Sequence, residues 1–418
     1  MKQNLFALST LSLASIIPAS TLAPTLANAD SHGIELAEGY EATIFADNLG
    51  RARHLVVRDN GDVYVAMRGE KGVMALRDTD GDGMADITTE YPSAAETGID
   101  IYKDHLYFTS NDTVFRAKLS DGELLPTGDI ETIVSGFPKQ RQHAAKTIAF
   151  DDKGHIYVNV GAPSNACQEK PRSKASPGLT PCPHLETQAS IWRFDAETSG
   201  QTQAENGHKY ASGVRNAVAI DWHPEGGLHL VAHGRDQLGT LWPEYYTIEQ
   251  NADLPAEEFH AVYDGADLGW PSTYYDGGKN KRMMAPEYGG DGIKEAPSGK
   301  YQKPIHAFPA HWAPNDLIFY KSGAFSPTMK GGAFIAFHGS WNRAPLPQQG
   351  YRVQFVHFKV GEIIGEPQDI AWGFQGADDL VDTRKSQYRP MGLAEGPDGA
   401  IYVSDSMKGR IWKITRSK

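Results

Sequence analysis

Three residues open similar stretches of the chain and differ in the chemistry they could perform. His143 begins HAAKTIAFDDKGHIYVNVGAPSN, Arg215 begins RNAVAIDWHPEGGLHLVAHGRD, and Arg389 begins RPMGLAEGPDGAIYVSD. A histidine titrates near neutral pH and can accept a proton from a hydroxyl group. Arginine presents a planar fork of N–H donors that suits carboxylates. Brought together, these side chains could bind a polycarboxylate and remove a proton beside it.

The three stretches are copies of one unit, in which a short strand, a tight polar turn and a second strand precede an irregular loop. Weaker copies start at His54 (HLVVRDNGDVYVAM) and at Thr97 (through LYFTSN), and residues 334–343, FIAFHGSWNR, show only a second strand. Copies at irregular intervals of about 40 to 100 residues are typical of a closed ring of small sheets. We therefore predict an all-β fold, a six-bladed β-propeller with long inserted loops.

The unit also predicts where its first residue lies. The two strands of a unit run antiparallel, so the start of the first and the loop after the second share one end of the sheet. A propeller packs its first strands around a central channel. We expect His143, Arg215 and Arg389 at one mouth of that channel, with the loops 161–165, 233–236 and 338–343. Alternatively, these side chains only form hydrogen bonds with neighbouring blades.

The composition suits such a fold and limits its partners. The chain has 418 residues, of which 40% are apolar and 22% charged, and its 43 Gly and 25 Pro can supply many turns. Its net charge of −12 argues against nucleic acid or an anionic membrane as a partner, because both favour a basic surface. A cluster of arginines in an acidic protein points to an anionic ligand.

Residues 1–29 are laid out as a secretory signal peptide, with Lys2, an apolar run from Leu5 to Ile17, and Ala27-Asn28-Ala29. A buried N-terminal helix is the alternative. We expect cleavage near Ala29, a single propeller domain over 30–418, and a periplasmic or secreted protein. No other apolar run approaches the roughly 20 residues that span a bilayer.

The two cysteines, Cys167 and Cys182, flank an insertion that contains Pro and Ser. In an oxidising compartment they could close a disulfide, and two free thiols are the alternative. The chain contains no CxxCH haem motif, so an electron acceptor for a redox reaction would be a separate molecule such as a cytochrome or a quinone.

The motifs QHAAKTIAF, IYVNVGAPSN, GVRNAVAIDWHPEGGLHLVAHGRDQLG, GADLGWP, FIAFHGSWNR and YRPMGLAEGPDGAIYVSD resemble the soluble quinoprotein sugar dehydrogenases, in particular their L-sorbosone dehydrogenase-like branch. The resemblance runs from about residue 39 to the end. It implies a six-bladed propeller that binds pyrroloquinoline quinone (PQQ) and calcium at the channel mouth. PQQ carries three carboxylates, which agrees with an arginine-rich mouth.

The resemblance also implies roles for single residues. His143 falls on the family's catalytic base, and Arg215 and Asn216 fall on an Arg-Asn pair beside the cofactor and the reacting atoms. Arg389 matches an arginine that contacts a PQQ carboxylate. Gly234 and Arg235 fall where backbone carbonyls hold the catalytic calcium.

Two positions depart from the glucose dehydrogenase branch of this family. That branch uses a lysine from the fifth repeat to contact PQQ, whereas this chain offers Asn342 and Arg343. It also has an arginine two residues before the position of Arg389, where this chain has Gln387. One anionic contact is therefore lost or supplied from elsewhere.

A second calcium site is predicted at residues 78–86, DTDGDGMAD, whose carboxylates alternate with residues that allow a sharp turn. The expected ligands are Asp78, Asp80, Asp82 and Asp86. The closing glutamate of an EF-hand is absent, because Thr89 stands at the twelfth position. The role would be structural, and a solvated acidic turn is the alternative.

Residues 237–314 form a predicted long insertion rich in aromatic side chains. Loops over a propeller mouth are where a substrate wall would lie, and aromatic faces commonly bind sugars. We expect His311 and Trp312 to contact substrate, against the alternative that the aromatic residues pack the inserted loops together.

The leading hypothesis is an exported quinoprotein dehydrogenase that oxidises an aldose or a sorbosone-like sugar aldehyde. Hydride passes to PQQ, calcium polarises the quinone, and His143 is the general base. Two alternatives are a calcium-dependent lactonase-type propeller hydrolase, whose site would be lined by carboxylates, and a non-catalytic propeller that serves as a binding module.

Overall fold

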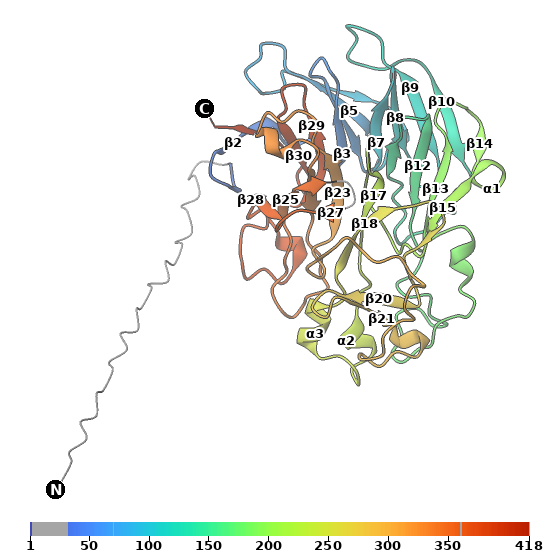
Figure 1. Ribbon diagram of the computed structural model, residues 1–418. Helices are drawn as coiled ribbons and strands as arrows, with labels where there is room; N and C mark the ends of the chain where they lie inside the picture. Colours follow the sequence, from blue (N-terminus) through green and yellow to red (C-terminus); the bar gives the residue numbers. More distant parts are fainter. Residues whose placement is uncertain (2–31, 70, 360–361, 418) are drawn as a thin grey trace.

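Six sheets stand around a central channel in the computed structural model, which describes residues 1, 32–69, 71–359 and 362–417 (Figure 1). The arrangement confirms the predicted all-β, six-bladed propeller. The predicted signal peptide, apart from Met1, lies outside the described residues.

The blades follow one another along the chain, and each begins with its innermost strand. Blade 1 contains β3 (Ala52–Val57), β4 (Val63–Met67), β5 (Gly72–Arg77) and β6 (Ile87–Tyr91). Blade 2 contains β7 (Ile99–Tyr102), β8 (His105–Thr109), β9 (Val114–Lys118) and β10 (Thr127–Ser135), joined by β14 (Gln201–Thr202). Blade 3 contains β11 (Ile148–Phe150), β12 (His155–Val160), β13 (Ser190–Asp195) and β15 (His208–Ser212), joined by β19 (Ala266–Asp267).

The second half of the ring repeats this plan. Blade 4 contains β16 (Ala219–His223), β17 (Gly227–Ala232), β18 (Glu257–Val262) and β22 (His306–Phe308). Blade 5 contains β23 (Pro314–Phe319), β24 (Ala333–Phe337), β25 (Arg352–Val356) and β28 (Gln368–Trp372), joined by β1 (Glu35–Leu36). Blade 6 contains β29 (Pro390–Glu395), β30 (Ile401–Asp405), β31 (Ile411–Arg416) and, as its outer strand, β2 (Tyr40–Ala46).

The polar turns inside the repeated unit have a local cause. In the turn between β11 and β12, the Asp151 carboxylate accepts the backbone N–H groups of Lys153 (2.9 Å) and His155 (2.8 Å). Gly154 completes the turn with φ 91, a conformation that other residues rarely adopt. These contacts fix the register of the two strands and therefore the end at which the following loop emerges.

The core lies between neighbouring blades. Trp412 on β31 is fully buried, and Phe374 and Tyr388 pack against it edge to face, with ring centroids 5.2 and 5.0 Å away. The inner strands β3, β7, β11, β16, β23 and β29 contact one another in turn around the ring. This packing holds the starts of the first strands at one end of the channel.

Residues 237–314 are only partly an insertion. They include β18 and β22 of blade 4, and the inserted part consists of α2 (Leu238–Leu241), α3 (Ile248–Asp253) and the hairpin of β20 (Thr273–Asp276) and β21 (Lys281–Met284). These inserted elements gather at one end of the ring, at the bottom of the view in Figure 1. Strand β18 was hidden in the sequence because it begins with two acidic residues, the buried Glu257 and the partly buried Glu258, whose carboxylates have specific partners.

Candidate active site

Loops from blades 3 to 6 interlock at one end of the ring, which we call the mouth. The N–H of Ala162, after β12, donates to the carbonyl oxygen of Arg215, before β16 (2.7 Å). His233, after β17, lies with its Nε2 2.6 Å from the carbonyl oxygen of Pro314 at the start of β23. The loops after β24 and β30 are joined by a similar contact. The starts of first strands and the loops after second strands therefore meet, as the repeat predicts.

His143 presents a defined tautomer at the mouth. Its Nδ1 lies 2.6 Å from the carbonyl oxygen of Ala162, which can only accept, so Nδ1 carries the hydrogen and Nε2 the lone pair. Burial, together with the nearby Arg215 guanidinium, lowers the pKa of His143 to about 3. The imidazole is therefore neutral at physiological pH and can accept a proton at Nε2.

Gly161 allows His143 and Asn216 to approach each other closely. A side chain at position 161 would place its Cβ 2.6 Å from the Cβ of His143 and 2.8 Å from Oδ1 of Asn216. Neither neighbour can move freely, because His143 is held by Ala162 and Asn216 is buried. The residue after β12 must therefore be glycine for both side chains to occupy the mouth.

The Arg215 guanidinium binds acceptors of the protein itself in this structure. It donates to the backbone and side-chain oxygens of Asn165 (3.2 and 3.1 Å), to the Gly234 carbonyl (2.9 Å) and to Oδ2 of Asp236 (2.9 Å). Burial alone would raise the pKa of Asp236, but Arg215 and Arg172 lower it to about 2. An ionised Asp236 therefore compensates Arg215, and a direct contact of Arg215 with a cofactor remains a prediction.

The two residues predicted to hold catalytic calcium lie in the loop between β17 and α2. The Gly234 carbonyl accepts a hydrogen bond from Arg215, and the Gly234 N–H donates to the buried carboxylate of Glu257 (2.7 Å). The Arg235 side chain pairs with Glu287. A guanidinium thus occupies one side of the Gly234 carbonyl, an arrangement that does not fit a second cation there. We derive no chemical step through calcium at this position.

Arg389 lies where its place in the sixth repeat predicts. Its guanidinium donates to the carbonyl oxygens of His338 (3.1 Å) and Gly339 in the loop after β24. Burial lowers the pKa of Arg389. Among the described residues, no carboxylate forms an ion pair with this guanidinium, since Asp405 instead accepts the backbone N–H of Arg389 (2.7 Å).

Arg53, at the start of β3, is a mouth residue that we did not predict. Its Nε donates to Oγ1 of Thr97 (3.3 Å), and within the described part of the chain it forms no ion pair. Burial, followed by the guanidiniums of Arg68, Arg51 and Arg389, lowers its pKa to about 9. Cations crowded in this way favour a polyanion, so the mouth fits a tricarboxylate cofactor. The sequence signal was available, because Arg53 stands at the start of a first strand just as Arg389 does.

The two side chains expected to replace the missing PQQ contact, those of Asn342 and Arg343, bind other parts of the protein in this structure. Arg343 donates to the Ala252 carbonyl (2.6 Å) and pairs with Asp253 (3.1 Å) at the end of α3. Oδ1 of Asn342 accepts the N–H of Gln237 (3.1 Å). Both side chains are buried and fasten the inserted elements to the loop after β24.

His311 and Trp312 are also buried. Nε2 of His311 lies 2.9 and 2.8 Å from the carbonyl oxygens of Asn251 and Leu254. Trp312 is 8% exposed and packs against Phe337, with the Arg352 guanidinium 4.5 Å above its ring. These contacts favour a packing role over contact with substrate for both side chains.

The disulfide between Cys167 and Cys182 is present and closes the loop after β12. Arg172 in this loop reaches three parts of the mouth: it donates to Gln142 (3.2 Å), to Asp236 (3.0 Å) and to Gln237 (2.5 Å). Gln142 directly precedes His143. The closed loop is thus tied to the candidate base and to the loop after β17.

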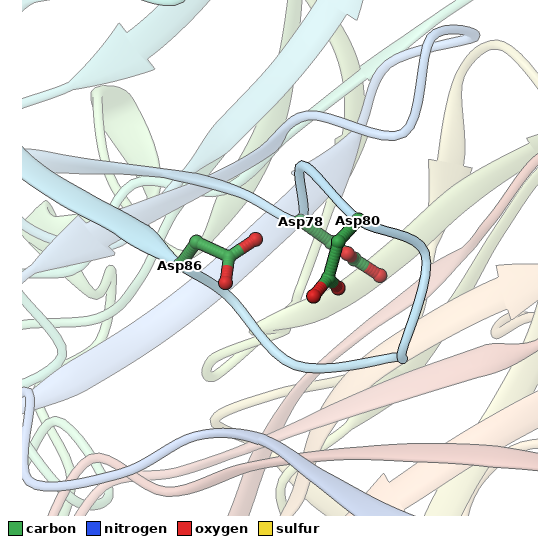
Figure 2. A group of neighbouring side chains, drawn as sticks. All are labelled: Asp78, Asp80 and Asp86. Carbon is green, nitrogen blue, oxygen red and sulfur yellow. The ribbon is translucent and has the colours of Figure 1, made fainter.

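The predicted structural calcium loop connects β5 and β6 of blade 1. Carboxylate oxygens of Asp78, Asp80 and Asp86 lie within 4.8 Å of one another and point to a common space (Figure 2). Asp82 is outside this group and accepts the N–H of Met84 (2.8 Å). The loop's own N–H groups donate to the three carboxylates, so the group is also consistent with a solvated turn.

The end of the channel away from the mouth contains a cavity of about 1010 Å³ lined by Asp100, Asp221 and Asp316 among other residues. Burial raises the pKa of all three carboxyl groups, that of Asp100 to about 7. Asp221 and Asp316 accept N–H groups of the next blade, from Phe319 (2.8 Å) and Leu393 (2.7 Å). These two acids join first strands around the ring.

Comparisons with known proteins give one consistent result. A sequence model of the family described as TrAA12-like matches residues 34–275 and 290–417. A curated pyrroloquinoline quinone-dependent pyranose dehydrogenase of Coprinopsis cinerea is 23% identical over 423 residues, which cover 92% of this chain and 54% of that protein. The chain thus spans about half the length of this relative.

Two solved structures share the fold. The PQQ domain of the Coprinopsis cinerea pyranose dehydrogenase, in its holo form, has a TM-score of 0.73 and 19% identity, covering 92% of this chain and 97% of that one. A family AA12 carbohydrate-active enzyme of Trichoderma reesei has a TM-score of 0.75 and 19% identity, covering 92% and 98%. The match to this family covers most of the chain, and membership of the sorbosone branch stays a prediction.

Proposed function

The chain belongs to the TrAA12-like family, and we propose that it is an exported quinoprotein dehydrogenase that oxidises a sugar. The proposal rests on one observation above the others. Arg53 and Arg389 stand at the starts of the contacting first strands β3 and β29, and neither is paired with a carboxylate among the described residues. A cofactor with several carboxylates would compensate both charges, and the Coprinopsis cinerea relative is named for such a cofactor.

In this proposal, Arg53 and Arg389 hold carboxylates of PQQ, and Arg53 supplies the contact that Gln387 cannot make. When bound, PQQ supplies a two-electron acceptor for a hydride. His143 accepts the proton of the substrate hydroxyl at Nε2, while Ala162 keeps its Nδ1 protonated and Asn216 packs beside it. Arg215 and Asp236 form a fixed, nearly neutral pair that sets the electrostatic surroundings of the base.

The substrate class is an aldose or a sugar-derived aldehyde hydrate, and the electrons leave to a separate cytochrome or quinone. The predicted signal peptide implies a periplasmic or secreted location. None of the helices in the described residues is long and apolar enough to cross a bilayer.

The test is reconstitution of the purified apoprotein. PQQ is titrated with calcium present and with EDTA, cofactor absorbance is followed, and dye reduction is measured with a panel of aldoses. We expect uptake at micromolar PQQ and dye reduction with at least one aldose. Absence of uptake under both conditions would overturn the proposal. Equal PQQ uptake with calcium and with EDTA would mean that cofactor binding does not require calcium, as the contact between Arg215 and Gly234 suggests.

A further inference from the structure

Trp341 differs from every other tryptophan of the chain. Its side chain is 49% exposed, whereas the other seven tryptophans, all of them in described residues, are buried or only partly exposed. It lies in the loop after β24, two residues beyond Gly339, which contacts Arg389 at the mouth. A large apolar ring is thus left facing solvent beside the candidate site.

The backbone that carries Trp341 is held firmly. The next residue, Asn342, is 3% exposed, and its Oδ1 accepts the N–H of Gln237. The Trp341 carbonyl accepts the N–H of Ala344 (3.3 Å). The indole therefore projects from a rigid loop, which is how side chains that bind a ligand are held ready for it.

Arg172 links the indole to the base. Its guanidinium carbon lies 6.0 Å from the centroid of the Trp341 ring. The same guanidinium donates to Gln142, the neighbour of His143, and to Asp236, the partner of Arg215. One planar group thus contacts the exposed indole, the residue that precedes His143 and the carboxylate that pairs with Arg215.

We propose that the Trp341 indole is the platform on which the ring of a cyclic sugar stacks, with Arg172 as the positioning residue that holds it beside His143. A pyranose presents an apolar face of C–H groups that packs on an aromatic ring, while an open-chain aldehyde has no such face. This inference rests on the proposed function and narrows its substrate class to aldoses in the ring form. Residues His311 and Trp312, predicted for this role, are buried, whereas Trp341 is accessible.

The test compares ring and open-chain substrates in the PQQ-loaded enzyme. D-glucose and D-xylose serve as ring sugars, and D-glyceraldehyde is too short to close a pyranose ring. In Trp341→Ala we expect KM for the ring sugars to rise about tenfold with kcat nearly unchanged, and kinetics with glyceraldehyde to stay as in the wild type. Trp341→Phe should retain most of the ring-sugar affinity. Tyr263→Ala removes another exposed aromatic ring, after β18 at the end of the blade away from the mouth, and should change nothing.

A second measurement does not need turnover. Methyl glucoside, a ring sugar without a free anomeric hydroxyl, should quench the tryptophan fluorescence of the wild-type protein and not that of Trp341→Phe. In Trp341→Ala, an equal rise in KM for ring and open-chain substrates, or no change in KM for either, would overturn the inference while leaving the proposed function intact. If Trp341→Ala lost activity only with a protein electron acceptor and not with the dye, Trp341 would be assigned to acceptor docking, and the inference would also be overturned. If no substrate reduces the dye, the proposed function fails, and the fluorescence titration alone decides the inference.

Discussion

The Nδ1 atom of His143 lies 2.6 Å from the carbonyl oxygen of Ala162, on the loop that follows the second strand of the same blade. The repeat therefore fixes the tautomer of its own first residue, because the loop that supplies the carbonyl always returns to the start of the first strand. The position of the proton acceptor, Nε2, follows from this single contact.

Replacing His143 by alanine should leave cofactor uptake intact and lower turnover by about 10² to 10⁴, the usual contribution of a general base. PQQ titration and steady-state dye reduction measure the two effects separately. His208→Ala, an exposed histidine paired with Asp264 on the outer part of blade 3, is the matched control and should behave as wild type. Turnover retained in His143→Ala would move the base to another residue.

The pH dependence of kcat/KM should reflect the lowered pKa of His143, which is about 3 in the protein. The base is active when neutral, so activity is present above this pKa and is lost as the pH falls through it. We expect the rate to remain nearly constant from pH 7 to about pH 5 and to show no acid limb at pH 6.5, the ordinary histidine value. An acid limb near pH 6.5 would show that another group, or an exposed His143, controls the reaction.

Replacing Arg53 by methionine should weaken PQQ binding about tenfold or more, because a charge-assisted contact to a carboxylate is lost. Methionine keeps an unbranched apolar side chain like the aliphatic part of arginine, so the packing at position 53 should change little. Arg116→Met removes a guanidinium that pairs with Glu131 on the outer strands of blade 2 and provides the control. Fluorescence titration with PQQ measures both affinities. Equal weakening in the two variants would mean that general charge, and not a direct contact, governs uptake.

The calcium loop of blade 1 gives a prediction about stability. Millimolar calcium should raise the melting temperature of the wild-type protein by about 2–5 °C relative to EDTA, since an ion that binds only the folded state stabilises it. Asp80→Asn should abolish this shift, whereas Asp82→Asn should keep it, because Asp82 lies outside the group of three carboxylates. No shift in the wild type would identify the loop as a solvated turn.

Asp100 in the channel cavity should make stability depend on pH. Burial raises its pKa in the folded protein to about 7, above the value of an unfolded chain. Between these two values only the folded state holds the proton, so stability from this group declines as the pH rises toward 7. Asp100→Asn lacks this ionisation. Its free energy of unfolding, measured relative to that of the wild type, should therefore be greater at pH 8 than at pH 4 by on the order of 2 kcal/mol. Chemical denaturation at both pH values measures this gain, and Asp59→Asn, an exposed acid on the same cavity, should show none.

Much of the ring could be predicted because its turns are local. An aspartate and a glycine between two apolar runs specify a hairpin. The hairpin fixes where its first residue lies, which is why the positions of His143 and Arg389 at the mouth could be predicted. Strands β18 and β23 were missed because Glu257 and Asp316 are buried polar residues whose partners come from other parts of the chain.

The directions of side chains at the mouth also depend on partners that lie far away in the sequence. Arg343 was expected to face the cofactor, but α3, which lies about 90 residues earlier, supplies the carbonyl of Ala252 and binds it. No local pattern encodes such a contact. Arg53 was missed for a simpler reason, since the weak first copy of the repeat was taken to start at His54.

The pairing of β2 with β31 joins residues near the two ends of the chain, with Tyr40 opposite Arg416 and Ala46 opposite Ile411. During synthesis the outer strand of blade 6 is therefore made before blades 1 to 5, and its partner β31 is made after them. Closure of the ring must await β31, so the six blades can assemble completely only after the partner of β2 has been made. This order makes the six-residue strand β31 as important for the integrity of the ring as any blade in the middle.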